Sequence, residues 1–186
     1  LGKGTIQVGC MDARSVTEVR TGSKRFKNKV EVRTASPMSV IPMFFVTRAN
    51  SGIKTIGDIK GKKLAIGARG SGMEGHARFI LNKLGLYKSI RPVYASFSPG
   101  ARAVREGKAD LQFQCCPKNP SLTELSELAE IRHVAIPQNR LDIVTNATPA
   151  YGQMQVKKGA FKGLQRDFNA IQLGVGSMVA ANSDPQ

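Results

Sequence analysis

At residues 63–72 the chain reads Lys-Leu-Ala-Ile-Gly-Ala-Arg-Gly-Ser-Gly, a short apolar run that leads into a glycine-rich turn. Residues 73–84 then repeat apolar side chains at helical spacing, so the stretch predicts a strand, a turn and a helix. Such a junction is suited to hold an anion, because glycines let the backbone approach a ligand and the first N–H groups of a helix point at negative charge. Arg69 adds a cation with forked donors, and Ser71 adds a hydroxyl.

Two better-known phosphate loops do not fit this turn. A Walker loop ends in Gly-Lys-Ser/Thr, whereas Gly72 is followed by Met73 and Glu74. Residues 70–75 meet the dinucleotide spacing GxGxxG, but residues 86–94 lack the acidic residue that should end the next strand. The turn therefore indicates an anion site rather than a nucleotide site.

The segments around the turn alternate in type. The predicted helices are 55–61, 73–84, 98–107 and 121–129, and the predicted strands are 64–66, 93–97, 109–115 and 131–136. The last helix is expected to begin at Ser121, with Glu124 completing a capping box. This alternation is typical of a parallel sheet covered by helices, so we predict an α/β lobe with a central parallel sheet.

The two ends of the chain do not continue this rhythm. Residues 41–47 form an apolar strand entered through a proline, and residues 171–180 resemble a strand with no obvious partner. We therefore predict two lobes, with 1–48 and 147–186 as parts of an incomplete first lobe and 49–146 as the second α/β lobe.

Composition narrows the classes of protein. Of the 186 residues, 41% are hydrophobic, which is enough for a core, and no apolar run is long enough to span a membrane. The net charge of +15 is spread along the chain, apart from the run Lys-Arg-Phe-Lys-Asn-Lys at 24–29. That run could contact nucleic acid or anionic lipid, but Trp is absent and no aromatic platform accompanies it. A solvated loop is the simpler interpretation, and no nucleic-acid partner is expected.

The cysteines and histidines predict neither a metal site nor an enzyme. Cys10, Cys115 and Cys116 match no disulfide framework or zinc spacing, and His76 and His133 stand alone. No metal or other cofactor is therefore expected. A bridge between the adjacent Cys115 and Cys116 would be strained, so buried thiols are the simpler interpretation. Because nothing marks a base beside a cysteine nucleophile, we predict no catalysis.

Several segments follow one another in a recognisable order. They are 44–67, which begins Phe-Phe-Val-Thr-Arg-Ala-Asn-Ser-Gly, then 70–72, 105–111, 116–125, 148–151 and 158–163. Together they closely resemble the TAXI family of extracytoplasmic solute receptors of TRAP transporters. The likeness covers roughly residues 4–182.

The resemblance implies a type II periplasmic binding protein, in which two α/β lobes close on a small solute. Family ligands are carboxylates such as glutamate or other dicarboxylates, delivered to the membrane subunits of a TRAP transporter. The resemblance implies ligand-binding roles for Gly70, Ser71 and Gly72 of the turn, Met11 and Asp12 at a first-lobe strand end, and Gln114, Cys115 and Cys116 at the strand end opposite. The chemistry of the turn itself adds Arg69 and the N–H of Met73 to the predicted ligand-binding residues.

The chain departs from the family pattern in three respects. The family's opening glycine-rich strand and helix do not precede Leu1, and its final helices do not follow Gln186. The resemblance thus implies an internal portion of a periplasmic or extracytoplasmic protein whose signal peptide lies outside the chain. Cysteines at 10, 115 and 116 also replace polar or small residues, which leaves the ligand open.

Two alternatives use the same fold. One is a ligand-sensing regulatory domain, which a DNA-binding segment upstream of Leu1 would favour. The other is an enzyme that makes a pyrimidine precursor or uses the neighbouring cysteines, which would require a reactive thiol.

Overall fold

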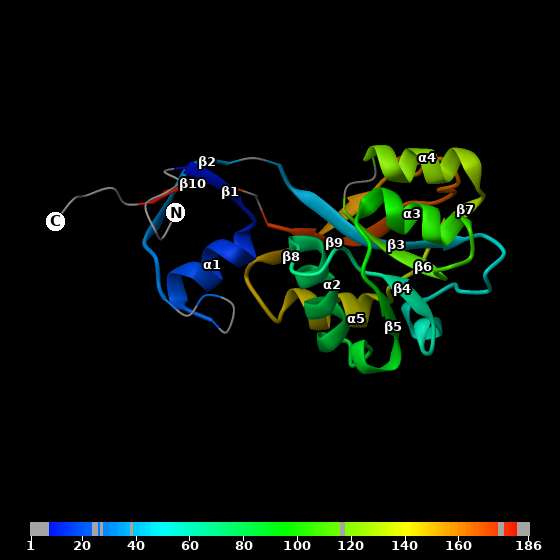
Figure 1. Cartoon of the computed structure of the whole chain (residues 1–186), viewed down its shortest axis with the longest axis horizontal. Helices are drawn as coiled ribbons and strands as arrows, with labels where there is room; N and C mark the ends of the chain where they lie inside the picture. The colour runs from blue at the N-terminus through cyan, green and yellow to red at the C-terminus, as the bar shows by residue number, and fades with distance from the viewer. Residues whose placement is uncertain are drawn as a thin grey trace. The chain divides into compact units, whose positions relative to one another are not determined.

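The chain is described from a computed structural model that covers residues 8–23, 26, 28–37, 39–115, 118–174 and 177–181. It divides into two compact units (Figure 1). Unit 1 is 1–41, 148–152 and 172–186, and unit 2 is 42–147 and 153–171. Residues 42–48 and 153–171, which the sequence assigned to the first lobe, thus belong to unit 2, because they supply strands of its sheet.

Unit 1 is a small antiparallel sheet with one helix. Strands β1 (Val8–Met11), β10 (Ser177–Ala181) and β2 (Val32–Pro37) pair in that order, and α1 (Ala13–Thr21) follows β1. Val19 of the helix packs on Val32 of the sheet, with Met11, Val16, Phe26 and Val30 around them. The predicted strand 171–180 is in fact two strands, since β9 (Phe168–Leu173) pairs in the larger sheet and β10 in this one.

The larger sheet has the order β5-β4-β6-β3-β9-β8, with β7 also pairing with β3. Its other strands are β3 (Ile41–Arg48), β4 (Lys63–Ala65), β5 (Arg91–Val93), β6 (Leu111–Cys115), β7 (Ile131–His133) and β8 (Tyr151–Val156). Strand β4 is parallel to β5 and β6, but β3 is antiparallel to β6 and β7. The predicted parallel sheet is therefore mixed. The apolar run of β3 suits a central strand in either direction, so its pattern holds no information about direction.

Helices cover both faces of this sheet. Figure 1 shows α3 (Phe97–Arg105) and α4 (Pro120–Leu128) over one face, with α2 (Gly72–Lys83) and α5 (Gln138–Thr145) over the other. Because successive side chains of a strand point to opposite faces, alternate residues of β3 pack on the two faces of the sheet. Phe44 packs in the cluster with α3 and α4 and stacks on Phe161, with 5.8 Å between the ring centres. Phe45 packs against Phe113, with 5.2 Å between the ring centres. Among the described residues, no helix is long and apolar enough to cross a membrane.

Two of the predicted helices differ from those observed. The predicted helix 55–61 is a short 3-10 helix, η1 (Ile56–Ile59), and at its start the Asp58 carboxylate accepts the N–H groups of Lys54 and Thr55. The cap of helix α4 lies two residues before the predicted cap Ser121. This cap is Asn119, whose side-chain oxygen accepts the Leu122 N–H at 3.0 Å, and a proline fills the first helical position.

Candidate anion-binding site

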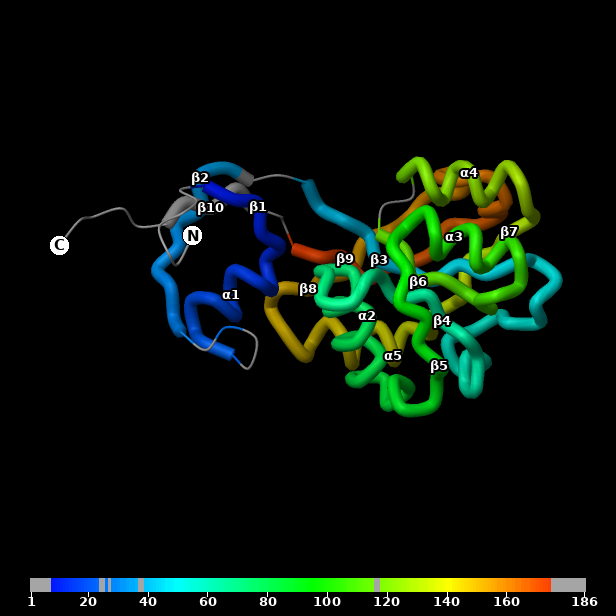
Figure 2. The backbone as a smooth tube through the Cα atoms, viewed as in Figure 1, coloured from blue at the N-terminus to red at the C-terminus, as the bar shows by residue number. Residues whose placement is uncertain are grey.

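Three helices of unit 2 begin at one edge of its sheet. Because β4, β5 and β6 are parallel neighbours, their carboxyl ends share that edge, and each is followed by a helix. Helices α2, α3 and α4 therefore start there (Figure 2). Each N-terminus carries a partial positive charge and unpaired N–H groups, so this edge of the sheet attracts anions.

The glycine-rich turn forms the junction between β4 and α2. Gly67 is buried at a φ of 105°, and a Cβ there would lie 2.8 Å from the Glu74 nitrogen. Only glycine allows this approach of the turn to the first helical residues. Ser71 caps α2, since its hydroxyl accepts the Glu74 N–H at 3.2 Å, while its own N–H donates to the Ala68 carbonyl at 3.1 Å. The following N–H groups, of Gly72 and Met73, have no acceptor within the helix.

Arg69 of the turn is held flat on an aromatic ring. Its guanidinium carbon lies 3.6 Å from the ring centre of Tyr94, a residue that directly follows β5. Stacking fixes the plane of the guanidinium and leaves its N–H edge available for an oxyanion. Among the described residues, no carboxylate forms an ion pair with Arg69.

Glu74 would oppose anion binding in the first turn of α2 if its charge were free. Its side chain is buried, with the residue 6% exposed, and forms an ion pair with Arg78 one turn later. The guanidinium of Arg78 also lies 5.6 Å from the ring centre of Tyr87. This pairing neutralises the carboxylate, so Arg69 and the helix N-terminus keep a net positive field.

Gln114 lies in a chain of buried amides. Its side-chain nitrogen donates to Gln112 at 2.9 Å, and its oxygen accepts from Asn119 at 2.9 Å. Gln112 in turn donates to the Phe97 carbonyl at 2.8 Å, so the chain links the starts of α3 and α4. Gln112 and Gln114 are both 0% exposed. The structure thus gives Gln114 a positioning role, because both ends of its amide are already used.

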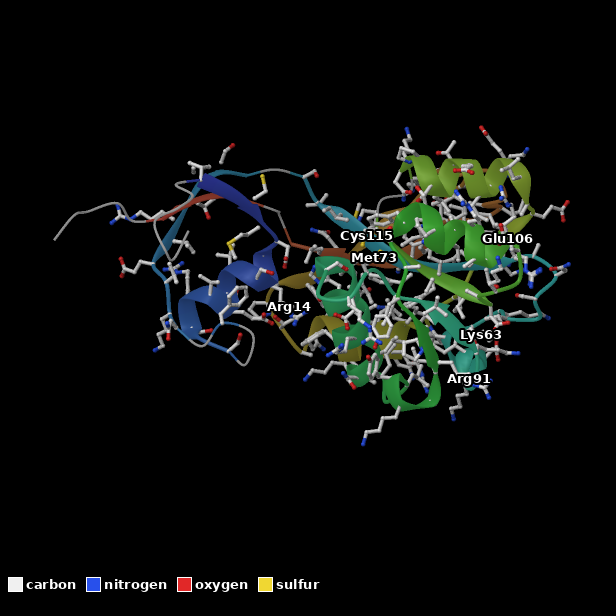
Figure 3. All side chains as sticks on the ribbon, in the orientation of Figure 1. Arg14, Lys63, Met73, Arg91, Glu106 and Cys115 are labelled. Carbon is white, nitrogen blue, oxygen red and sulfur yellow. The ribbon has the colours of Figure 1, made fainter. Side chains whose placement is uncertain are left out.

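The other sequence-predicted residues divide between the units. Met73 and Cys115 lie at the same edge of unit 2 (Figure 3), the first buried and the second half-buried. Cys116 lies outside the described residues, as do residues 24, 25 and 27 of the basic run at 24–29. Met11 and Asp12 belong to unit 1, where the Asp12 carboxylate accepts the Ser15 N–H at 2.9 Å and so caps α1.

Sequence reasoning missed two residues of this edge. Tyr94 was assigned only to a strand, and nothing in the sequence pairs it with Arg69, since the two meet only through the β4–β5 pairing. Asn119 could have been found, because Asn followed by Pro is a typical helix start. Within the described ranges, no three His, Cys, Asp or Glu side chains gather as metal ligands would.

An open groove of about 1140 Å³ lies elsewhere in unit 2. It is lined by residues between 126 and 135, by 162–168, and by Ala49 and Lys54, and none of the sequence-predicted residues lines it. Its residues include the start of β7, which belongs to the opposite edge of the sheet from the helix N-termini. The groove is therefore separate from the edge at which α2, α3 and α4 begin.

His133 in this groove should make stability depend on pH. It stacks on Phe168 at 3.6 Å, and burial lowers the pKa of His133 to about 4 from an ordinary 6.5. As the pH falls, the His133 imidazole therefore takes up a proton in the unfolded chain before it does so in the folded one. The free energy of unfolding decreases as a result by roughly 3 kcal/mol between about pH 6.5 and about pH 4. We expect His133→Phe, which keeps the stacking, to remove most of this loss in urea titrations at the two pH values. An equal loss in both proteins would contradict the assignment.

Comparison with known proteins supports the fold. A family profile described as the NMT1-like family matches residues 1–186. A search of curated proteins gave no match. Among solved structures, the chain resembles the periplasmic sulfonate-binding protein of a sulfonate ABC transporter from Methylobacillus flagellatus KT, with a TM-score of 0.53 and 19% identity over 97% of this chain and 43% of that chain.

Two further structures are similar. One comes from work on glutathione import by GshT and the cystine ABC importer TcyBC of Streptococcus mutans, with a TM-score of 0.55 and 13% identity over 98% of this chain and 59% of that one. The other is a TctC solute-binding protein from Polaromonas, with a TM-score of 0.54 and 12% identity over 96% of this chain and 58% of that one. The chain thus spans about half the length of these proteins and shares their mixed α/β fold.

Proposed function

The chain belongs to the NMT1-like family, and from this premise we propose that it is part of an extracytoplasmic solute receptor that captures a small anion for a membrane transporter. The observation that supports this most is Arg69, stacked on Tyr94 beside the N-terminus of α2 and without an ion pair in the described residues. An oxyanion placed there would accept forked N–H donors and the first N–H groups of a helix.

The solute is proposed to be a carboxylate or a sulfonate. A carboxylate presents coplanar oxygens and a sulfonate presents a tripod of oxygens, and both can accept hydrogen bonds from the N–H edge of a guanidinium. The resemblance to TAXI receptors favours a carboxylate such as glutamate and delivery to a TRAP transporter, whereas one similar structure is a sulfonate-binding protein. The role is capture without catalysis.

Titration with small anions tests this proposal. Isothermal calorimetry with ethanesulfonate, taurine, glutamate and succinate should identify at least one ligand of the wild-type protein. The substitution Arg69→Ala should weaken the binding of that ligand by about 10- to 100-fold, because a charge-assisted hydrogen bond contributes about 1.5–3 kcal/mol.

Arg91→Ala is the matched control, because Arg91 is an exposed arginine at the other end of the parallel strands. It should leave the dissociation constant unchanged within about twofold. An Arg69→Ala protein that binds the same anion as tightly as wild type would rule out the proposed site.

A further inference from the structure

Five cations gather at the edge of unit 2 opposite the helix N-termini. They are Lys60, Lys62, Lys63, Lys88 and Arg91, named here the basic edge. Lys63 and Arg91 are the first residues of β4 and β5 and lie opposite each other in the parallel register. Figure 3 shows these two on the same side of unit 2, away from Met73 and Cys115.

Backbone hydrogen bonds fix the basic edge in place. The Gly61 N–H donates to the Ser89 carbonyl at 2.6 Å, and the Arg91 N–H donates to the Lys62 carbonyl at 2.8 Å. Gly61 has a φ of 75°, which favours glycine in this turn. Neighbouring strands lie about 4.8 Å apart, so the fold itself holds like charges side by side at some cost in stability.

The charges of the basic edge are largely uncompensated. In the part of the chain that the structure describes, none of the five forms an ion pair, and all but the partly exposed Lys62 are exposed. Asp58 and Asp110 lie on the same segments, but among the described residues neither forms an ion pair with any of the five. Asp58 accepts the N–H groups of residues 54 and 55, and Asp110 accepts that of residue 63 at 2.7 Å, so each carboxylate keeps its charge and the two offset only part of the five positive charges. The edge therefore keeps a net positive charge that attracts external anions.

We propose that the basic edge binds the anionic phospholipid headgroups of a membrane surface. Lysines, which make up four of the five cations, are depleted in protein–protein interfaces, where aromatic and apolar anchors supply most of the affinity. The exposed large hydrophobic residues of the described chain, Val8, Val40, Phe97, Leu128 and Ile143, all lie on other segments. A diffuse lipid surface needs no such anchor, since each lysine or arginine gains from its negative potential.

This contact would keep the protein at the membrane while the anion-binding edge faces away. The two edges are the opposite ends of the same parallel strands, β4 and β5, so one can be engaged while the other stays open. Retention at the surface raises the local concentration of the receptor without involving the solute site. The inference therefore stands independently of solute binding.

Vesicle sedimentation tests the inference. Wild type should sediment with vesicles that contain phosphatidylglycerol but not with pure phosphatidylcholine, and less so above about 0.15 M salt. The variant Lys60→Gln, Lys62→Gln, Lys63→Gln and Arg91→Gln should bind about 600-fold more weakly, at about fivefold for each of the four cations. The matched control, Lys83→Gln, Lys118→Gln, Lys158→Gln and Lys162→Gln, removes equal charge from exposed sites elsewhere and should lose less than about tenfold.

An equal loss of vesicle affinity in the two variants would mean that only net charge matters, and it would overturn the basic edge as a site. The proposal would also be overturned if the wild-type protein did not sediment with the vesicles at low salt. Tighter binding to duplex DNA than to vesicles at the same salt would replace the lipid with a nucleic acid. Thermal melts of both variants confirm folding, which is expected because the substituted side chains are at the surface.

Discussion

Gly67→Ala should lower the free energy of unfolding by about 3–5 kcal/mol, the largest effect expected of any single substitution in the turn. The new Cβ would lie 2.8 Å from the Glu74 nitrogen and 2.9 Å from the Met73 Cβ. Neither neighbour can yield cheaply, because one is backbone and the other begins a buried side chain. The positive φ of 105° adds strain of its own.

Gly70→Ala is the matched control for this prediction. Gly70 also has a positive φ, of 74°, but a Cβ there would meet nothing within 4 Å. It should therefore cost only about 1 kcal/mol. Urea denaturation with both variants measures the difference as a shift of the midpoint at constant slope. Equal midpoints for the two variants would show that the close approach of Gly67 to α2 does not exist.

Gln114→Leu should destabilise the protein by about 2–4 kcal/mol, although leucine fits a buried strand position. The substitution leaves the Gln112 oxygen without its donor at a site that is 0% exposed, and it removes one of the acceptors of the Asn119 amide, which also donates to the Cys115 carbonyl at 3.1 Å. Gln165→Leu, at an exposed glutamine, should change stability by less than about 0.5 kcal/mol. The midpoints of urea unfolding of the Gln114→Leu and Gln165→Leu variants measure this difference.

Asn119→Asp examines the same amide chain without removing the cap of α4. A carboxylate still accepts the Leu122 N–H, but it no longer donates to Gln114. If Gln114→Leu and Asn119→Asp both left the midpoint where wild type has it, the buried amides would have no positioning role.

The turn itself was predictable from the sequence because its chemistry is local. Glycines that need a positive φ, a serine in the cap position and apolar residues at helical spacing all occur within 63–84, and α2 begins within one residue of its expected start. The same local signals predicted the helices that follow β5 and β6, with errors of one or two residues at their caps.

What the sequence could not predict depends on pairing between distant segments. The antiparallel direction of β3 has no local signature, because a fully buried strand reads the same either way. Tyr94 reaches Arg69 only because β4 and β5 are neighbours. Gln114 was expected to touch the ligand because it ends a strand at the right edge, but alternation turns its side chain into the core, where other amides bond to it.

The most direct test of the central claim compares Ser71→Asp with Ser71→Asn in the anion titration. Both side chains are good helix caps, so both variants should keep the stability of α2 within about 1 kcal/mol. Only aspartate places a negative charge where the solute's oxyanion is proposed to lie. The dissociation constant of the tightest-binding anion should rise by at least about 10- to 100-fold for Ser71→Asp and by less than about fivefold for Ser71→Asn. Equal dissociation constants for the two variants would contradict an anion held at the N-terminus of α2.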